Sequence, residues 1–217
     1  MRRHCVPCLK NATGIPLIVP VIHMGFLILI LGLVLFLGVH TLPTQRQWRA
    51  ALLARLGEGI YKALYALIAL VGIALIAKGY SLYRATEWTD IWHPPHAFRH
   101  ITLALMLPSV ILVIAAYIRG RIYVTLKHPM LAGVKLWAAA HLLSNGDLGS
   151  MILFGSVLAW AVYDRISLKS RVDTVALPIP VGGVGNDVIA VGVGIVAYLA
   201  LTYVFHPLVI GVPVVGV

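Results

Sequence analysis

Two ionisable side chains interrupt one of the apolar runs of this chain. Lys135 and His141 lie within residues 129–143, where aliphatic and small residues otherwise predominate. An ionisable group inside a membrane helix is costly and normally faces the bundle interior or a polar cavity. Both residues are therefore candidates for chemistry. The simpler interpretations are that Lys135 extends to the membrane edge and that His141 is a neutral imidazole bonded to a neighbouring helix.

Trp137 and Asn145 share a helical face with His141, because each is four residues away from it. We expect Trp137 to pack beside the imidazole. Asn145 belongs to the turn sequence SNGD, in which Asn145 and Gly146 tolerate positive φ and Asp147 can cap the next helix. A turn role explains both polar residues, although Asn145 could also orient the imidazole of His141.

Further histidines flank the apolar runs, namely His40, His100, His128 and His206. Several imidazoles without paired carboxylates inside the apolar runs suit haem b better than a zinc hydrolase, because haem needs only one or two axial imidazoles and an apolar slot. His96 and His100 lie four residues apart and at best share a helical face as a metal pair. The cysteines Cys5 and Cys8 are interpreted as incidental thiols, since no second CxxC accompanies them.

The composition places these residues in a membrane. Hydrophobic residues make up 60% of the 217 residues, charged residues only 11%, and the mean hydropathy is +0.95; a soluble domain has about 25% charged residues. The net charge of +10 comes from lysines and arginines that lie between apolar runs, without a basic stripe beside exposed aromatics. Membrane topology explains that charge, and no nucleic-acid partner is expected.

Six apolar runs are each close to the length that spans a bilayer. They cover about 24–40, 60–77, 101–118, 129–143, 148–163 and 188–205. A lipid-exposed backbone must satisfy its own hydrogen bonds, and the alternation typical of a membrane barrel is absent. The sequence therefore predicts an all-α polytopic membrane protein, a single bundle of about six transmembrane helices. Residues 24–217 form this domain, whereas residues 1–23 are interpreted as a leader, with a possible translation start at Met24.

The basic residues of the loops predict the orientation of the bundle. They fall in three segments, with Arg46, Arg49 and Arg55 in the first, Arg119, Arg121 and Lys127 in the second, and Arg165, Lys169 and Arg171 in the third. These segments are expected to face the cytoplasm. The turn 144–147 has no basic residue, and both termini are expected outside.

Several runs of this sequence resemble the NnrU family. They are FLGVHT (36–41), residues 56–80, WHPPHAFRH (92–100), the long block 128–169 and FHPLVIGVP (205–213). The resemblance begins at about Met24. It implies a multi-pass protein of the bacterial inner membrane linked to nitrite and nitric oxide metabolism, with denitrification or respiratory-chain components as possible partners.

NnrU proteins are in turn similar to plant 15-cis-zeta-carotene isomerase, a membrane enzyme with haem b. The resemblance implies that His40 in GVHT and His141 in WAAAH correspond to histidines important for that haem. Ala138 stands where the isomerase has a cysteine. This departure puts a cysteine-for-histidine ligand switch, and with it isomerase chemistry, in doubt.

The predicted topology puts His40 near the cytoplasmic edge and His141 towards the outer end, too far apart for one iron. His100 is therefore the second candidate partner of His141. Three functions follow: a haem-binding component that supports nitrogen-oxide reduction, a haem-dependent isomerase or oxidoreductase acting on a lipid-soluble substrate such as a carotenoid, and a cofactor-free membrane assembly protein.

Overall fold

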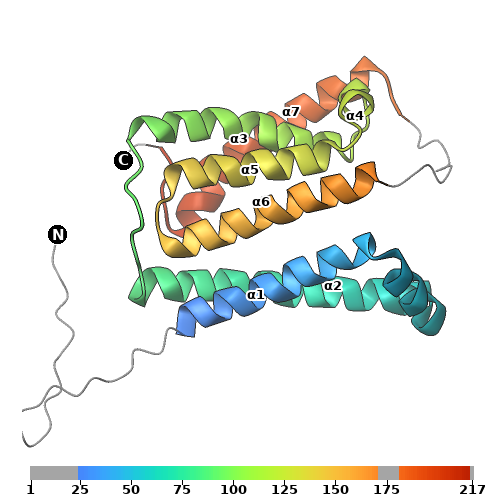
Figure 1. Cartoon of the computed structure of the whole chain (residues 1–217). Coiled ribbons are helices and arrows are strands. Elements are labelled where there is room, and N and C mark those ends of the chain that lie inside the picture. Colours follow the sequence, from blue (N-terminus) through green and yellow to red (C-terminus); the bar gives the residue numbers. More distant parts are fainter. Residues whose placement is uncertain (1–23, 171–180, 216–217) are drawn as a thin grey trace, which may run out of the picture.

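The computed structural model describes residues 24–170 and 181–215, and this part of the chain is an all-α membrane bundle (Figure 1). The predicted leader, residues 1–23, lies outside the described residues together with Cys5 and Cys8. Within these residues, five helices are long and apolar enough to cross a membrane. The 16-residue helix Pro129–Ser144 is shorter, yet it lies within the bundle beside the spanning helices. The prediction of an all-α bundle is therefore confirmed.

The helices follow the predicted apolar runs with some differences. In chain order they are α1 (Met24–Thr41), the short η1 (Leu42–Thr44), α2 (Arg46–Thr86), α3 (Ala97–Ala115), α4 (Arg121–Leu126), α5 (Pro129–Ser144), α6 (Leu148–Lys169), α7 (Val184–Ala200) and η2 (Leu201–Ile210), which has π-helical hydrogen bonding. Residues 46–55, expected to form the first basic loop, are helical. The expectation missed this segment because its apolar residues are too few to register as a spanning run.

Gly57 divides α2 into two parts. Its φ of +76° and ψ of 164° belong to a region that is essentially restricted to glycine. The part before Gly57 lies across one end of the bundle, whereas the part after it runs along the bundle (Figure 1).

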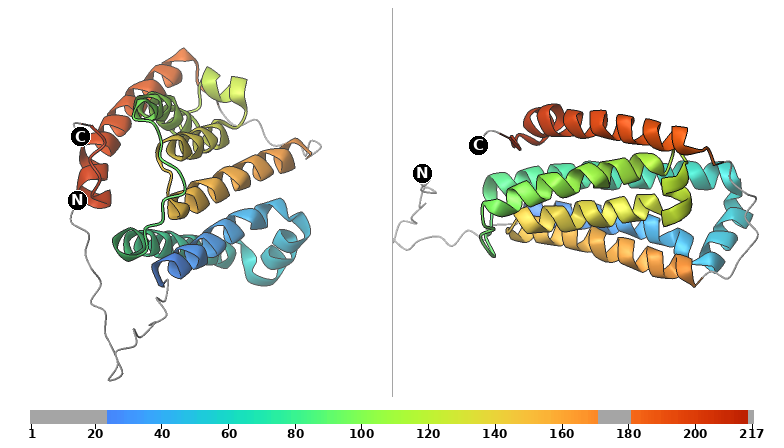
Figure 2. Two further views of the ribbon diagram at one scale, coloured as in Figure 1. Left: turned by 60° about the vertical axis from the view of Figure 1, so that its left-hand side comes forward. Right: turned by 90° about the horizontal axis from the view of Figure 1, so that it is seen from above.

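The bundle has two parts that meet at α6. Helices α1 and α2 form a closely packed antiparallel hairpin, while α7, α3, α5 and α6 follow one another as neighbours (Figure 2). The hairpin packs against the second part mainly through α6. Glycines allow the close approach within the hairpin: a Cβ added at Gly32 would lie 2.6 Å from the backbone nitrogen of Ile76.

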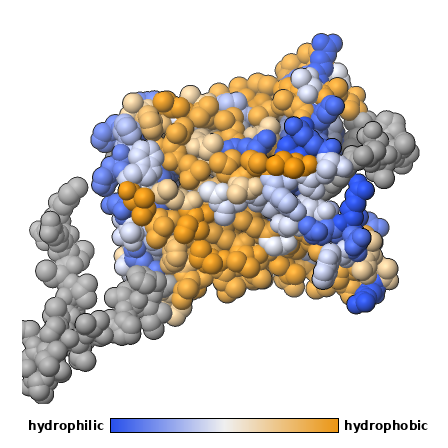
Figure 3. Space-filling model, viewed as in Figure 1, coloured by the Kyte–Doolittle hydropathy of each residue, from blue (hydrophilic) through white to orange (hydrophobic). Residues whose placement is uncertain are grey.

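The outer surface identifies the lipid-facing belt. Apolar side chains cover the middle of the molecule and polar ones gather towards both ends (Figure 3). Large exposed residues of this belt include Leu67 and Leu70 on α2 and Val188 and Val196 on α7. The predicted basic segments at 46–55 and 119–127 and the described part of the third, 165–169, all lie at one end, because consecutive spanning helices alternate in direction. We call this the basic end. Arg171 of the third segment lies outside the described residues.

Candidate functional site

His141 lies in an aromatic setting between α5, α6 and η2. Its ring centre is 5.0 Å from that of Trp137, one turn earlier on α5, as the spacing predicts. Phe154 of α6 stacks on the imidazole at 4.5 Å with an interplanar angle of 26°. His206 of η2 lies on another side, with ring centres 6.4 Å apart and planes inclined by 21°. The site therefore brings two imidazoles and two aromatic side chains together.

Both imidazoles are held by backbone carbonyls. His141 Nδ1 lies 2.9 Å from the carbonyl oxygen of Trp137, and His206 Nδ1 lies 2.9 Å from that of Leu201. A carbonyl oxygen only accepts hydrogen bonds, so Nδ1 is the donor in each case. In the neutral ring Nε2 then carries the lone pair. This is the tautomer that a metal ligand needs, and the backbone bond fixes the orientation of the ring.

The π-helical segment η2 explains how His206 reaches α5. η2 continues α7 and passes behind α5 in Figure 1. Wide π-helical turns are rare and occur frequently at functional sites. The side-chain bond of His206 goes to the carbonyl five residues earlier. Arg84 of α2 donates to the carbonyl oxygen of Ile210 at 3.1 Å, which ties the end of η2 to the hairpin.

The two imidazoles are close enough to contact one group bound between them. Their ring centres lie 6.4 Å apart. A ligating imidazole nitrogen lies about 2 Å from its metal. Within the described residues, no group of three or more His, Cys, Asp or Glu side chains is positioned for a metal ion. Two axial imidazoles are nevertheless enough for haem, whose porphyrin supplies the other ligands.

His40 occupies a separate aromatic cluster. Its ring contacts Phe36, Tyr65 of α2 and Trp160 of α6 at 4.2, 5.3 and 5.6 Å. Its Nδ1 donates a 2.7 Å hydrogen bond to the carbonyl oxygen of Phe36. The Nδ1 atoms of His141 and His206 bond to backbone carbonyls in the same way. The Trp160 indole nitrogen is buried without a hydrogen-bond partner among the described residues.

His40 and His141 contact α6 at different levels. Their respective partners, Trp160 and Phe154, are six residues apart, about 9 Å along a helix axis. The predicted topology likewise put these two histidines at different levels of the bundle. The structure brings His141 to His206 rather than to His40.

His100 lies in the first turn of α3 and is exposed. No ring contact in the described part of the chain joins it to His141. His96, directly before α3, is exposed as well. The expected face shared by His96 and His100 thus points away from the bundle core.

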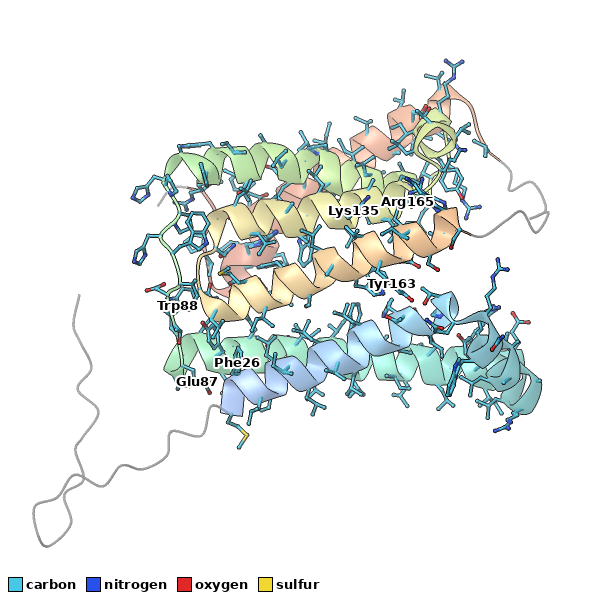
Figure 4. The ribbon with its side chains drawn as sticks, viewed as in Figure 1. Phe26, Glu87, Trp88, Lys135, Tyr163 and Arg165 are labelled. Carbon is cyan, nitrogen blue, oxygen red and sulfur yellow. The ribbon has the colours of Figure 1, made fainter. Side chains whose placement is uncertain are left out.

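Lys135 supports the simpler of its two interpretations. Its side chain is partly exposed, in the half of α5 that lies towards the basic end (Figure 4). A long cationic side chain in this position extends to the membrane edge while its methylene groups cover apolar surface.

The turn after α5 confirms the predicted capping. Asp147 Oδ1 accepts a 2.9 Å bond from the Ser150 backbone at the start of α6. Asn145 Nδ2 donates to the backbone carbonyl of His141 at 2.8 Å, so it stabilises the end of α5 and not the imidazole. Gly146 accepts backbone bonds from Ile91 and Trp92 of the loop between α2 and α3.

Phe154 and the pairing of His206 with His141 were not predicted. The position of His206 near the same end of the bundle was available from the apolar runs. Its contact with α5 was not, because that contact depends on the π-helical path of η2.

The comparison with known families gives one result. The family described as NnrU protein matches residues 28–214, a range that includes His40, His141 and His206. Neither the curated proteins nor the solved structures contain a significant match to the chain. A family match that covers most of the chain establishes that the chain belongs to that family. This multi-pass, helical membrane protein therefore belongs to the NnrU family.

Proposed function

We propose that this protein binds haem b inside the membrane and supports nitrite and nitric oxide metabolism. The observation that carries the proposal is the pair His141 and His206, with ring centres 6.4 Å apart and both Nδ1 atoms bonded to backbone carbonyls. Trp137 and Phe154 provide aromatic surface beside this pair. Apolar surroundings and correctly protonated imidazoles are what a b-type haem requires.

In this proposal His141 and His206 would hold the haem. Haem would supply a redox-active iron. The protein's own contribution would be to fix the two rings through their Nδ1 bonds, to exclude water through the aromatic side chains and to present Nε2 of each neutral ring to the haem. Ala138, fully buried three residues before His141, offers no thiol for a ligand exchange.

The physiological setting of the proposal comes from the family. The protein would lie in the bacterial inner membrane, with its basic end in the cytoplasm, and would act beside denitrification or respiratory-chain components. Reporter fusions at Arg49 and Asn145 test the orientation, since these residues lie at opposite ends of the bundle. A cytoplasmic report at Arg49 and an external report at Asn145 are expected; the reverse pattern would invert the bundle.

The visible spectrum of the detergent-purified full chain, expressed with ample haem, tests the proposed cofactor. Wild-type protein should show a Soret band. His141→Ala should abolish or strongly shift this band, and His206→Ala should shift it by converting two-histidine ligation to one. His93→Ala is the matched control, because His93 is an exposed histidine of the α2–α3 loop.

The same experiment separates the alternatives. Loss of the band in His40→Ala with an unchanged band in His206→Ala would assign the second ligand to His40. Wild-type protein without Soret absorption would refute haem binding and favour the cofactor-free assembly role.

A further inference from the structure

A cavity at the basic end lies outside the proposed haem site. It has a volume of about 370 Å³ and is lined by Arg49, Leu53, Glu58, Tyr61 and Lys62. These residues come from both sides of the break at Gly57. The cavity therefore exists because the segment 46–56 turns across the end of the bundle at this glycine.

The charges around the cavity favour an anion. Arg49 and Lys62 are cationic and Glu58 is the single carboxylate of the lining. Lys62 Nζ lies 2.6 Å from Glu58 Oε1, and both side chains of this pair are more than two-thirds exposed. Two cations and one carboxylate leave one excess positive charge beside the cavity.

The lining also offers a buried hydrogen-bonding group and an apolar wall. Tyr61 is 8% exposed, and its hydroxyl is buried without a hydrogen-bond partner among the described residues. A buried hydroxyl without a partner is unfavourable and is satisfied when an acceptor binds. Leu53 adds apolar surface to the same cavity. A cation, a free hydroxyl and an apolar wall together match a phosphate group that carries an acyl chain.

The position of the cavity identifies the source of this phosphate. The segment 46–56 lies at the end of the spanning part of α2, where lipid headgroups are found. Trp48 on this segment is 70% exposed, and Arg46 and Arg55 are exposed as well. Exposed tryptophan and arginine on a helix that lies across a bundle end are typical of an interfacial segment.

From these observations we propose that the cavity is a binding site for the headgroup of an anionic phospholipid. Arg49 and Lys62 contact the phosphate, the Tyr61 hydroxyl donates to a phosphate or ester oxygen, and Leu53 contacts the start of an acyl chain. The inference does not depend on haem binding.

Lipid-dependent thermal unfolding of the detergent-purified full chain tests the proposal. Phosphatidylglycerol should raise the unfolding temperature, whereas phosphatidylcholine and sn-glycerol 3-phosphate should not. The double variant Arg49→Gln/Lys62→Gln should bind phosphatidylglycerol about fivefold more weakly, as expected for two partly exposed charge contacts. Tyr61→Phe keeps the ring and removes only the hydroxyl, so it should weaken binding without loss of fold.

The matched control is Arg121→Gln/Lys127→Gln. It removes the same charge at the same end of the bundle without altering the cavity lining. Equal phosphatidylglycerol binding by the two double variants would show general surface electrostatics and overturn the site. An unchanged affinity in Tyr61→Phe would overturn the role of its hydroxyl. Stabilisation by sn-glycerol 3-phosphate alone would overturn the lipid assignment in favour of a soluble phosphate ligand.

Discussion

The α1–α2 hairpin and the layer formed by α7, α3, α5 and α6 both contain close glycine contacts, but side-chain bonds join their helices at different places. Within the hairpin, Gly25 and Gly32 of α1 approach α2, and Gly72 and Gly79 of α2 approach α1. Within the layer, Gly133 of α5 and Gly194 of α7 approach α3. The layer also has side-chain bonds to backbone carbonyls of neighbouring helices. Ser109 donates to the Gly133 carbonyl at 2.9 Å, and Thr102 donates to the Ala140 carbonyl at 2.8 Å.

The candidate haem site lies in the layer but away from its close glycine contact on α5. Close backbone packing leaves no room between two helices for a ligand. Gly133, which approaches Ser109 of α3, is about two turns before His141. His141 and His206 occur next to the α5–α6 turn. His40 lies on the hairpin surface that faces α6.

Gly32→Ala should have the largest effect on stability, because it disrupts the hairpin directly. The added Cβ would lie 2.6 Å from the Ile76 backbone nitrogen and 2.9 Å from the Gly72 carbonyl oxygen. We expect a loss of about 2 kcal/mol or more, measured by unfolding in detergent. Gly38→Ala on the same helix is the control, since its Cβ would meet nothing within 4 Å. Equal stability of the two variants would refute glycine-mediated packing.

Asp147→Ala should have the next largest effect and act on the layer. It removes the cap of α6 at a fully buried position, which should cost about 1–2 kcal/mol. Asp147→Asn keeps an accepting oxygen and removes the charge. The second carboxylate oxygen of Asp147 is buried without a partner in the described residues. Asparagine should therefore preserve stability, and a loss as large as that of alanine would assign the stabilisation to the carboxylate charge.

Ser109→Ala tests the bonds between helices of the layer. Ser109 is 1% exposed and its hydroxyl joins α3 to α5. We expect a loss of about 1 kcal/mol in the same unfolding measurement. Ser156→Ala provides the comparison, because the Ser156 hydroxyl bonds only within α6. An effect of Ser156→Ala as large as that of Ser109→Ala would argue against a special role for bonds between helices.

Trp137→Phe should have the smallest effect and refine the site. Phenylalanine keeps an aromatic ring beside His141 and leaves the backbone carbonyl that binds Nδ1. If haem is bound as proposed, the Soret band should persist with a small shift, while His141→Ala abolishes it. Complete loss of the band in Trp137→Phe would make Trp137 essential for binding the cofactor.

Turn chemistry was predicted more reliably than contacts between helices. The SNGD sequence identified both the end of α5 and the cap of α6, because Asp147 bonds to a residue only three positions away. The helical segment before Gly57 was missed, since residues 46–55 carry too few apolar residues to be distinguished from a basic loop. The π-helical path of η2 was missed for a similar reason: its side chains resemble those of an ordinary apolar helix.

The sequence by itself determined the class of the protein, the positions of its spanning helices and the end at which its basic residues gather. These properties follow from the lengths of the apolar runs and the charges between them. Only the tertiary structure decided that His206 faces His141 and that His40 lies in a separate cluster. In a soluble helix the apolar stripe shows which face is buried. In a membrane the lipid and the bundle interior are both apolar, so the sequence pattern does not distinguish the face that meets a neighbouring helix from the face that meets lipid.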